Sequence, residues 1–515
     1  MKSKKILMTL MAFGFSLALF SQPSAQQINL LDAYFQKELT DWNVPGMAIA
    51  IVSNDSVYLS KGYGVTDVLT RQKVDENTLF AVASNTKAFT ATALAMLVDE
   101  GKLTWEDKVQ QFLPWFELYD PYVSHEMTIT DLLSHRSGLT TFSGDLIWYG
   151  SNCDRETIIR KAKHLLPKHG FREQFGYSNI MYLTAGEVIP AVVGLSWDDF
   201  VQSRILSPIG MKRSTLHVKD LAQRENVAQP HTYINGEPKI IPWLDWDNIG
   251  PAGSLISSAS EMGLWLQFQL NEGIVGQDTL LRDIRFFEMQ SPKTINNLSR
   301  GAVNRFPSTH FKAYGLGWSL MDYLGKKVVS HNGGYDGMIS QSLFIPEENI
   351  GFVILTNSLS SVYYPLMYKT LDVLLNNQEQ KDWSTEILAQ IKKGEAFAQK
   401  QNEQLEARRD TKTKPSLPLT AYTGTFSCPI YDAVEVSLKD GMLYLTMKDS
   451  PIFQGPLTHW QFNSFKVVFP EAPSLPPGLV TFQINRDGKV EQMEIFIDNP
   501  DFDFTEMKLI KAFEE

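Results

Sequence analysis

A serine and a lysine three positions apart, Ser84 and Lys87, form the only Ser-x-x-Lys sequence in the chain. A short apolar run at residues 78–82 precedes them, and residues 88–99 are rich in Ala, Leu and Met, which predicts a strand or loop leading into a buried helix. Positions i and i+3 share a helix face, so the hydroxyl and the amine can meet. The start of a helix also favours developing negative charge, as on a serine becoming an alkoxide. The pair indicates nucleophilic catalysis by Ser84.

A lysine in water is protonated at neutral pH, so Lys87 could act as a base only if its pKa fell by about three units. Burial or a nearby cation can supply such a shift, which corresponds to roughly 4 kcal/mol. On this pattern alone, Ser84 could instead cap a helix and Lys87 could stay in solvent. The choice between these interpretations depends on further motifs.

The second motif is Tyr177-Ser178-Asn179, which precedes an apolar helical pattern at residues 180–193. A tyrosine there could transfer a proton between nucleophile and leaving group, and an asparagine amide could hold a substrate carbonyl. Another Tyr-x-Asn begins at Tyr233, but a Gly-Glu-Pro turn follows it, so that copy is interpreted as structural.

The third motif, His331-Asn332-Gly333-Gly334, lies between strand-like segments. Glycine in a strand often marks the close approach of a backbone or a ligand, and its bare N–H group can bind an oxyanion. A single histidine at a strand end is more often structural, but the glycine cluster favours a site.

Other catalytic patterns are poorly supported. The chain has no Gly-x-Ser-x-Gly elbow, no His-Glu-x-x-His, no Walker loop and no dinucleotide-binding glycine motif. His135 could act as a base for Ser137, but a structural loop after a helix is the preferred interpretation. No metal or other cofactor is expected.

The chain is predicted to have four parts. Residues 1–25 combine a basic start, an apolar run at residues 6–20 and a small polar end, as in a cleavable secretory signal peptide; a short membrane anchor is the alternative, disfavoured by the length of the run. Residues 28–375 have strand-like runs at both ends and helical patterns between them, which predicts an α+β domain with an antiparallel sheet flanked by helices. Residues 376–416 form a charged helical linker.

Residues 417–515 contain six short β-type runs, with Asp440-Gly441 and Asp487-Gly488 as hairpin turns. They predict a small all-β C-terminal barrel or sandwich. We expect two folded domains because 515 residues exceed the roughly 250 to 300 at which one hydrophobic core stops growing.

Charge and cysteine content exclude several classes of partner. The formal net charge of −11 argues against nucleic-acid binding. The chain has no predicted helix with a run of lysines or arginines, so attachment to a membrane surface is not expected. Signal cleavage would leave no stable membrane anchor, and a periplasmic or secreted protein is therefore expected. Cys153 and Cys428 are expected to be isolated thiols.

Taken together, the motifs resemble those of the penicillin-binding-protein-like serine hydrolases related to class C β-lactamases and D-alanyl-D-alanine carboxypeptidases. The resemblance covers about residues 28–375, where three motifs match in order and spacing: Ser84-x-x-Lys87, Tyr177-x-Asn179 and His331-x-Gly333. Three further segments, residues 132–139, 251–257 and 314–318, also resemble sequences of this family. The C-terminal domain is similar to the lipocalin-like modules of some exported peptidases, where it could shape the cleft, mediate oligomerisation or only add stability.

The resemblance implies roles for these residues. Ser84 would be acylated, Lys87 and Tyr177 would form its proton-transfer pair, and Asn179 would contact substrate. The N–H groups of Ser84 and Gly334 would form the oxyanion hole. His331 and Gly333 would also bind substrate, with His331 beside the far end of the substrate.

One departure from the family pattern concerns specificity. True class C β-lactamases carry a lysine and a threonine where this chain has His331 and Asn332, so a fixed ammonium is replaced by an imidazole whose charge depends on pH. This pattern resembles the esterase and D-aminopeptidase branches.

The sequence therefore predicts an exported serine hydrolase that cleaves an amide or ester bond in a small molecule or short peptide, with peptides that contain D-residues among the candidate substrates. A true β-lactamase and a non-catalytic penicillin-binding or sensor protein are the alternatives.

Overall fold

The computed structural model describes residues 22–379 and 381–512, so most of the predicted signal peptide lies outside the described residues. The first helix, α1 (Ala25–Asp41), begins at a capping box formed by Ser24 and Gln27. Signal cleavage and export stay predictions.

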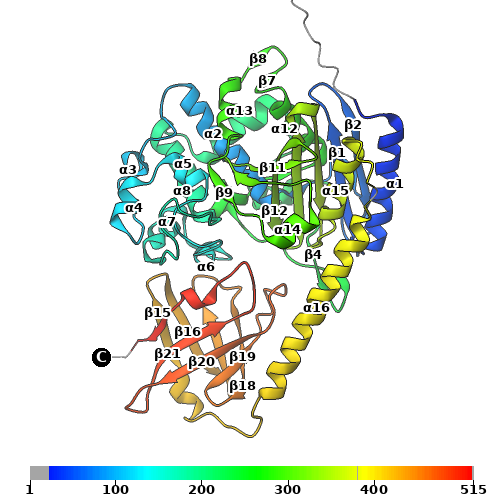
Figure 1. Cartoon of the computed structure of the whole chain (residues 1–515). Helices are drawn as coiled ribbons and strands as arrows, with labels where there is room; N and C mark the ends of the chain where they lie inside the picture. Colours follow the sequence, from blue (N-terminus) through cyan, green and yellow to red (C-terminus); the bar gives the residue numbers. More distant parts are fainter. Residues whose placement is uncertain (1–21, 380, 513–515) are drawn as a thin grey trace, which may run out of the picture.

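One antiparallel sheet organises the larger domain (Figure 1). The two ends of this domain meet in it, because β1 (Gly46–Val52) pairs with β14 (Ile350–Thr356). The strand order is β2-β1-β14-β13-β12-β11-β10-β9. The predicted α+β class is confirmed, as is an antiparallel sheet in which strands from the two ends of the domain meet. The other strands of the sheet are β2 (Val57–Gly64), β9 (Thr294–Asn296), β10 (Lys312–Tyr314), β11 (Ser319–Tyr323), β12 (Lys326–Tyr335) and β13 (Met338–Ile345).

Helices cover both faces of the sheet and form a subdomain beside it (Figure 1). The helix after Ser84 is buried almost all round, as expected of a core helix without a polar face. The helices are α2 (Thr86–Asp99), α3 (Val109–Phe112), α4 (Pro121–Glu126), α5 (Ile129–Leu133), α6 (Asp145–Trp148), α7 (Arg155–Lys161), α8 (Asn179–Val193), α9 (Trp197–Val201), α10 (Ser207–Ile209), α11 (Gly250–Gly253), α12 (Ala259–Leu270), α13 (Asp283–Met289), α14 (Arg300–Arg305) and α15 (Tyr363–Leu374).

Two separate hydrophobic cores lie on the two faces of the sheet. Side chains alternate along β1, so Ala48 and Ala50 join the core that contains α2 and α12, whereas Met47 and Ile49 join the core of α1 and α15. Three short strand pairs complete the domain: β3 (Phe80–Ala81) with β6 (Ile256–Ser257), β4 (His231–Ile234) with β5 (Glu237–Ile240), and β7 (Ile274–Val275) with β8 (Asp278–Thr279).

A long helix, α16 (Trp383–Arg408), runs from the sheet domain to a closed eight-stranded barrel (Figure 1). The all-β prediction and both hairpin turns are confirmed, but the sequence patterns missed the Gly- and Pro-containing β18 and the short β22. The strands are β15 (Gly424–Cys428), β16 (Tyr431–Lys439), β17 (Met442–Met447), β18 (Gln454–Gln461), β19 (Ser464–Val467), β20 (Gly478–Ile484), β21 (Val490–Phe496) and β22 (Leu509–Lys511).

The barrel docks on the segment around α6. The Glu506 carboxylate accepts hydrogen bonds from the Ser143 hydroxyl and the Gly144 N–H group. Tyr149 lies between the rings of Phe453 and Phe502, with centroids 5.8 and 4.3 Å away. The two domains therefore share one interface next to the residues that begin α6.

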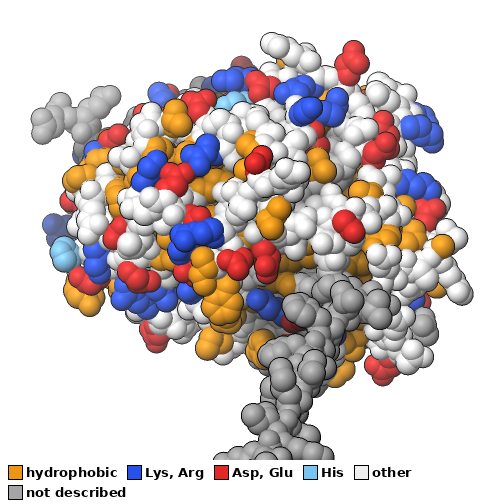
Figure 2. Space-filling model, turned by 90° about the horizontal axis from the view of Figure 1, so that it is seen from above, with side chains coloured by type: hydrophobic (Ala, Val, Ile, Leu, Met, Phe, Trp, Pro, Cys, Tyr) orange, Lys and Arg blue, Asp and Glu red, His pale blue; other side chains and the backbone are white. Residues whose placement is uncertain are grey.

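The outer face seen in Figure 2 carries acidic and basic side chains interspersed, with hydrophobic side chains scattered among them. No single described helix is long and apolar enough to span a membrane. One pair, Asn179–Val193 with Trp197–Ile209, meets the length and composition criterion jointly, with a bend of 80° between its helices.

Removing the Glu506 carboxylate should weaken the docking of the barrel. Glu506→Ala leaves the Ser143 hydroxyl and the Gly144 N–H group without their acceptor, so we expect a loss of about 1–3 kcal/mol and a lower midpoint in thermal unfolding. The exposed barrel residue Glu491 is the matched control, for which Glu491→Ala should change stability by less than about 0.5 kcal/mol. Equal midpoints for the two variants would contradict this account of the interface.

Candidate active site

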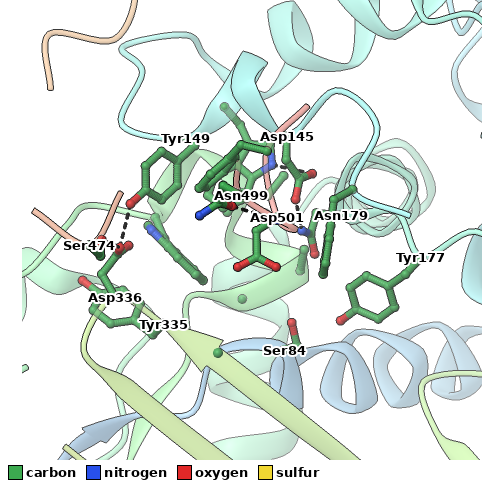
Figure 3. A pocket seen from close by; sticks show the side chains of 18 of the residues that line it. Ser84, Asp145, Tyr149, Tyr177, Asn179, Tyr335, Asp336, Ser474, Asn499 and Asp501 are labelled. Carbon is green, nitrogen blue, oxygen red and sulfur yellow. Dashed lines mark hydrogen bonds between the residues drawn. The ribbon is translucent and has the colours of Figure 1, made fainter. Parts of the chain in front are cut away.

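Ser84 lies where a short strand turns into a helix at the wall of a cavity. β3 ends at Ala81, and the 3₁₀ turn Ala83–Asn85 leads directly into α2. Ala83 has φ of +46°, a conformation that non-glycine residues rarely adopt and that often occurs at functional sites. Ser84 keeps part of its surface exposed toward a cavity of about 460 Å³ (Figure 3). The predicted position of Ser84 at the start of a buried helix is confirmed.

Lys87 is completely buried, and its amine lies beside the Ser84 hydroxyl. Lys87 Nζ is 3.1 Å from Ser84 Oγ, 2.7 Å from Asn179 Oδ1 and 2.8 Å from the Ala252 carbonyl oxygen. The solvated-lysine interpretation is therefore wrong. A neutral amine has two N–H groups and one lone pair, so Asn179 and Ala252 can take both N–H groups while the lone pair faces Ser84.

Electrostatics favour that neutral state. Burial lowers the pKa of Lys87 well below its ordinary value of 10.5, and the nearby Asp145 carboxyl opposes the shift. Burial also raises the pKa of Asp145 to about 7, which weakens that opposition. The environment thus shifts the pKa of Lys87 in the direction that a lysine base requires.

Asp145 is a site residue that the sequence analysis missed. Its Oδ2 accepts a hydrogen bond of 2.7 Å from Asn179 Nδ2, which turns Asn179 Oδ1 toward Lys87. Its Oδ1 accepts from the Trp148 indole N–H. Asp145 begins a four-residue helix in a segment without a recognisable motif, so no signal in the sequence alone identified it.

Tyr177 completes the group around Ser84. Its ring centroid lies 4.6 Å from Lys87 Nζ. Burial raises the pKa of Tyr177 well above its ordinary value of 10, although a hydrogen bond with Ser84 acts in the opposite direction. The phenol is therefore held in its protonated form, beside a lysine held in its neutral form.

His135 supports Tyr177 and is not a base for Ser137. Its Nδ1 accepts the Ser178 N–H group at 3.0 Å, and its ring lies 4.3 Å from that of Tyr177. Burial lowers the pKa of His135 well below its ordinary value. The structural interpretation of this loop is confirmed.

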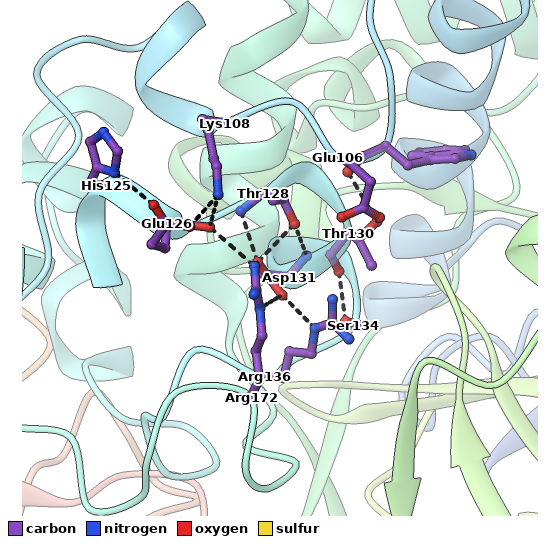
Figure 4. A network of polar contacts seen from close by, with 11 residues as sticks. Glu106, Lys108, His125, Glu126, Thr128, Thr130, Asp131, Ser134, Arg136 and Arg172 are labelled. Atoms are coloured by element: carbon purple, nitrogen blue, oxygen red, sulfur yellow. Dashed lines mark hydrogen bonds and ion pairs between the residues drawn. The ribbon is translucent and has the colours of Figure 1, made fainter. Parts of the chain in front are cut away.

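A buried carboxylate fixes the two loops that contain His135 and Tyr177 (Figure 4). Asp131 has no exposed side-chain surface, and it binds Arg136 in the first loop and Arg172 in the second. The Arg172 N–H group also donates to the Arg136 carbonyl. This network holds the loop that contains Tyr177 against the loop that contains His135.

The end of β12 lies against the Ser84 turn and alternates between two environments. Asn332 and Gly334 are exposed and line the cavity, whereas His331 and Gly333 are buried and do not line it. A Cβ atom on Gly333 would lie 2.8 Å from the Ser84 nitrogen. Beyond Ser330, no described strand pairs with β12 on its β11 side, so that edge is available beside Ser84.

The expectation that His331 carries a pH-dependent charge is wrong. His331 is 3% exposed and does not line the cavity. Its Nε2 bonds the Tyr314 hydroxyl at 2.8 Å, and burial with the nearby Lys87 lowers its pKa to about 3. The imidazole is neutral at physiological pH and supports Tyr314. The second Tyr-x-Asn copy, in the β4–β5 hairpin, is also away from the cavity.

The barrel contributes part of the cavity wall. Side chains from two barrel loops line it together with the residues around Ser84 (Figure 3): Ser474, Leu475, Asn499, Asp501 and Phe502. Among the residues described, no group of three or more His, Cys, Asp or Glu side chains could hold a metal ion.

Comparison with known proteins agrees with this geometry. The family model described as Beta-lactamase matches residues 31–372, and the chain belongs to this family of serine hydrolases. A domain of unknown function, DUF3471, matches residues 408–511, which include the barrel.

Two relatives and one solved structure illustrate the range of similar proteins. The unguisins hydrolase ungD of Aspergillus violaceofuscus is 29% identical, over 81% of this chain and 78% of its own length. Protein flp of Staphylococcus aureus strain MW2 is also 29% identical, over 72% of this chain and 70% of its own. The octameric penicillin-binding protein homologue from Pyrococcus abyssi has 22% identity and a TM-score of 0.59, covering 94% of this chain and 100% of its own, which shows a shared fold.

A methyl group on Gly333 should disturb the nucleophile, whereas one on Gly334 should not. The added Cβ would lie 2.3 Å from the Val82 oxygen at Gly333, but no closer than 3.8 Å to Ile339 at Gly334. Because a displacement of about 1 Å can cost 10²-fold in rate, we expect Gly333→Ala to slow fluorophosphonate labelling of Ser84 by about 10²-fold. Gly334→Ala should slow it by less than about tenfold. Similar rates in both variants would contradict the proposed contact.

Proposed function

We propose that this chain is an exported serine hydrolase that cleaves an amide or ester bond in a short peptide or small molecule through an acyl-enzyme on Ser84. The observation that carries the proposal is the 3.1 Å contact between the buried Lys87 amine and the Ser84 hydroxyl. A buried neutral amine in this position can accept the proton that the nucleophile must lose.

Acylation would begin as Ser84 Oγ bonds to the substrate carbonyl carbon while Lys87 Nζ takes the Oγ proton. The N–H groups of Ser84 and Gly334 would stabilise the oxyanion, since backbone donors aimed at developing charge are effective in a closed cavity. Tyr177, held as a neutral phenol, would give its proton to the leaving group and recover one from Lys87.

Deacylation would reverse these roles. Water in the cavity would attack the ester carbonyl, and the Tyr177–Lys87 pair would take its proton and return one to Ser84 Oγ. Asn179 lines the cavity while its Oδ1 bonds Lys87, so it would orient the amine and contact substrate. The hydrolase name of the ungD relative supports turnover over a purely binding role.

Two features favour a peptide-like substrate over a penicillin. His331, at the position of the class C lysine, is buried beneath Tyr314 and offers no cation in the cavity. The free edge of β12 beside Ser84 can pair with an extended backbone, as strand edges do in peptide recognition. Export is supported by the signal-peptide pattern of residues 1–25.

Intact mass and product release should be measured together for the wild type and Ser84→Ala. The panel consists of p-nitrophenyl esters, D-amino-acid anilides and penicillin. We expect turnover of an ester or anilide that Ser84→Ala abolishes, and losses of about 10²-fold or more in Lys87→Ala and Tyr177→Phe, as for lost acid-base partners.

Other outcomes would revise the proposal. A stable penicillin adduct without turnover of any substrate would favour the non-catalytic binding protein, and rapid penicillin turnover would favour a true β-lactamase. An unchanged rate in Lys87→Ala would contradict the mechanism itself.

A further inference from the structure

The cavity in front of Ser84 is acidic. Three carboxylates line it, Asp145, Asp336 and Asp501, and its lining contains no lysine, arginine or histidine among the described residues. Asp145 is already engaged, because it accepts hydrogen bonds from Asn179 and Trp148. The other two lie toward the barrel and have no role in the chemistry at Ser84.

Asp336 is held by hydrogen bonds to only one of its two carboxylate oxygens. Its Oδ1 accepts from the Tyr149 hydroxyl at 2.6 Å and from the Ser474 hydroxyl at 3.4 Å. Its Oδ2 is buried without a hydrogen-bond partner among the described residues. A buried carboxylate oxygen without a donor is costly, and such groups usually have a partner. Because Asp336 lines the cavity, a cationic group that reached Oδ2 would satisfy it.

Asp501 faces the same region from the other domain. It lies in the barrel loop between β21 and Phe504, and Figure 3 shows its carboxylate extending into the cavity beside Asn499. Asp501 is an exposed residue that lines the cavity, and it makes no ion pair within the described part of the chain. Burial, together with the Asp501 charge, raises the pKa of Asp336 to about 6. The two carboxylates repel each other, and a cation between them would relieve that repulsion.

A third unsatisfied group lies in the same wall. The Trp246 side chain is 8% exposed and lines the cavity, and its indole N–H is buried without an acceptor among the described residues. This donor can bind a carbonyl oxygen. The wall thus offers acceptors for a cation and a donor for a neighbouring peptide group.

From these observations we infer that Asp336 and Asp501 form a subsite for the protonated amino group of the substrate, so that the barrel selects substrates with a free amine. The inference rests on the proposed hydrolase function and adds the class of substrate. It also assigns the barrel a role in specificity, through a loop that reaches the catalytic cavity.

The spacing along β12 indicates where that amine lies. Gly334 lies beside Ser84 on β12, and Asp336 is the first residue of the hairpin turn that follows β12, so their Cα atoms are at most about 7 Å apart. An extended peptide advances about 3.3–3.6 Å per residue. The amine is therefore expected within about two residues of the scissile carbonyl, as in a dipeptidyl substrate.

The test uses glycine substrates, which avoid any question of chirality. Glycylglycine p-nitroanilide, its N-acetyl derivative and glycine p-nitroanilide are compared at pH 7, where the α-amine is mostly protonated and Asp336 mostly ionised. We expect kcat/KM for the free dipeptide to exceed that for the acetylated one by at least about tenfold, as for loss of a charge-assisted hydrogen bond. The single-residue substrate should be cleaved less efficiently than the free dipeptide.

Variants assign the effect to the two carboxylates. Asp336→Asn and Asp501→Asn should each lower kcat/KM for the free dipeptide by about tenfold and leave the acetylated substrate unchanged. Asp498→Asn is the matched control, because Asp498 is exposed in the same loop and does not line the cavity. Fluorophosphonate labelling of Ser84 in each variant shows that the site is still folded.

A second measurement keeps the inference independent of turnover. Glycylglycinamide should protect Ser84 from fluorophosphonate at concentrations about tenfold lower than N-acetylglycylglycinamide, in the wild type only. Equal protection, equal kcat/KM for free and acetylated substrates, or a preference that persists in both aspartate variants would overturn the subsite. Absence of turnover together with amine-selective protection would contradict the proposed function and leave the subsite supported.

Discussion

The contact between the buried Lys87 amine and Ser84 is the interaction on which the rest of the site depends. A lysine with no exposed surface is expensive to charge. Each unit by which its pKa falls costs about 1.4 kcal/mol of folding free energy at pH values below the folded-state pKa, and this cost disappears as the pH rises above the unfolded-state pKa. The hydrogen bonds to Asn179 and Ala252 stabilise the buried neutral amine, because they satisfy both of its N–H groups. What remains free is the lone pair, which faces the nucleophile.

Each recognised motif contributes a different contact to that arrangement. The residues around Ala252 supply a carbonyl to Lys87, and Gly333 lets β12 approach the Ser84 nitrogen. Gly317 lets the chain before β11 pack closely on α2, because a Cβ at this position would lie 3.0 Å from the Lys87 carbonyl oxygen. The loop containing His135 supports the ring of Tyr177. Motifs that are weak one at a time thus correspond to the separate walls of one site.

The sequence predicted what local patterns encode and missed what only the tertiary structure creates. The Ser84 turn, the sheet closed by its ends and the hairpins of the barrel follow from residue spacing and turn chemistry. The neutral state of His331 and the role of Asp145 arise from burial among residues distant in the chain, which no spacing reveals. The entry of Asp501 into the cavity likewise depends on how the barrel docks.

The titration of Lys87 tests the central claim most directly. In protein labelled with ¹³C at lysine Cε, the resonance that disappears in Lys87→Met belongs to this residue, and its chemical shift can be followed with pH. We predict a midpoint well below the ordinary lysine value of 10.5, with a neutral amine above that midpoint. A midpoint near 10.5 would mean that Lys87 is an ammonium at neutral pH, and the account of Ser84 activation would be wrong.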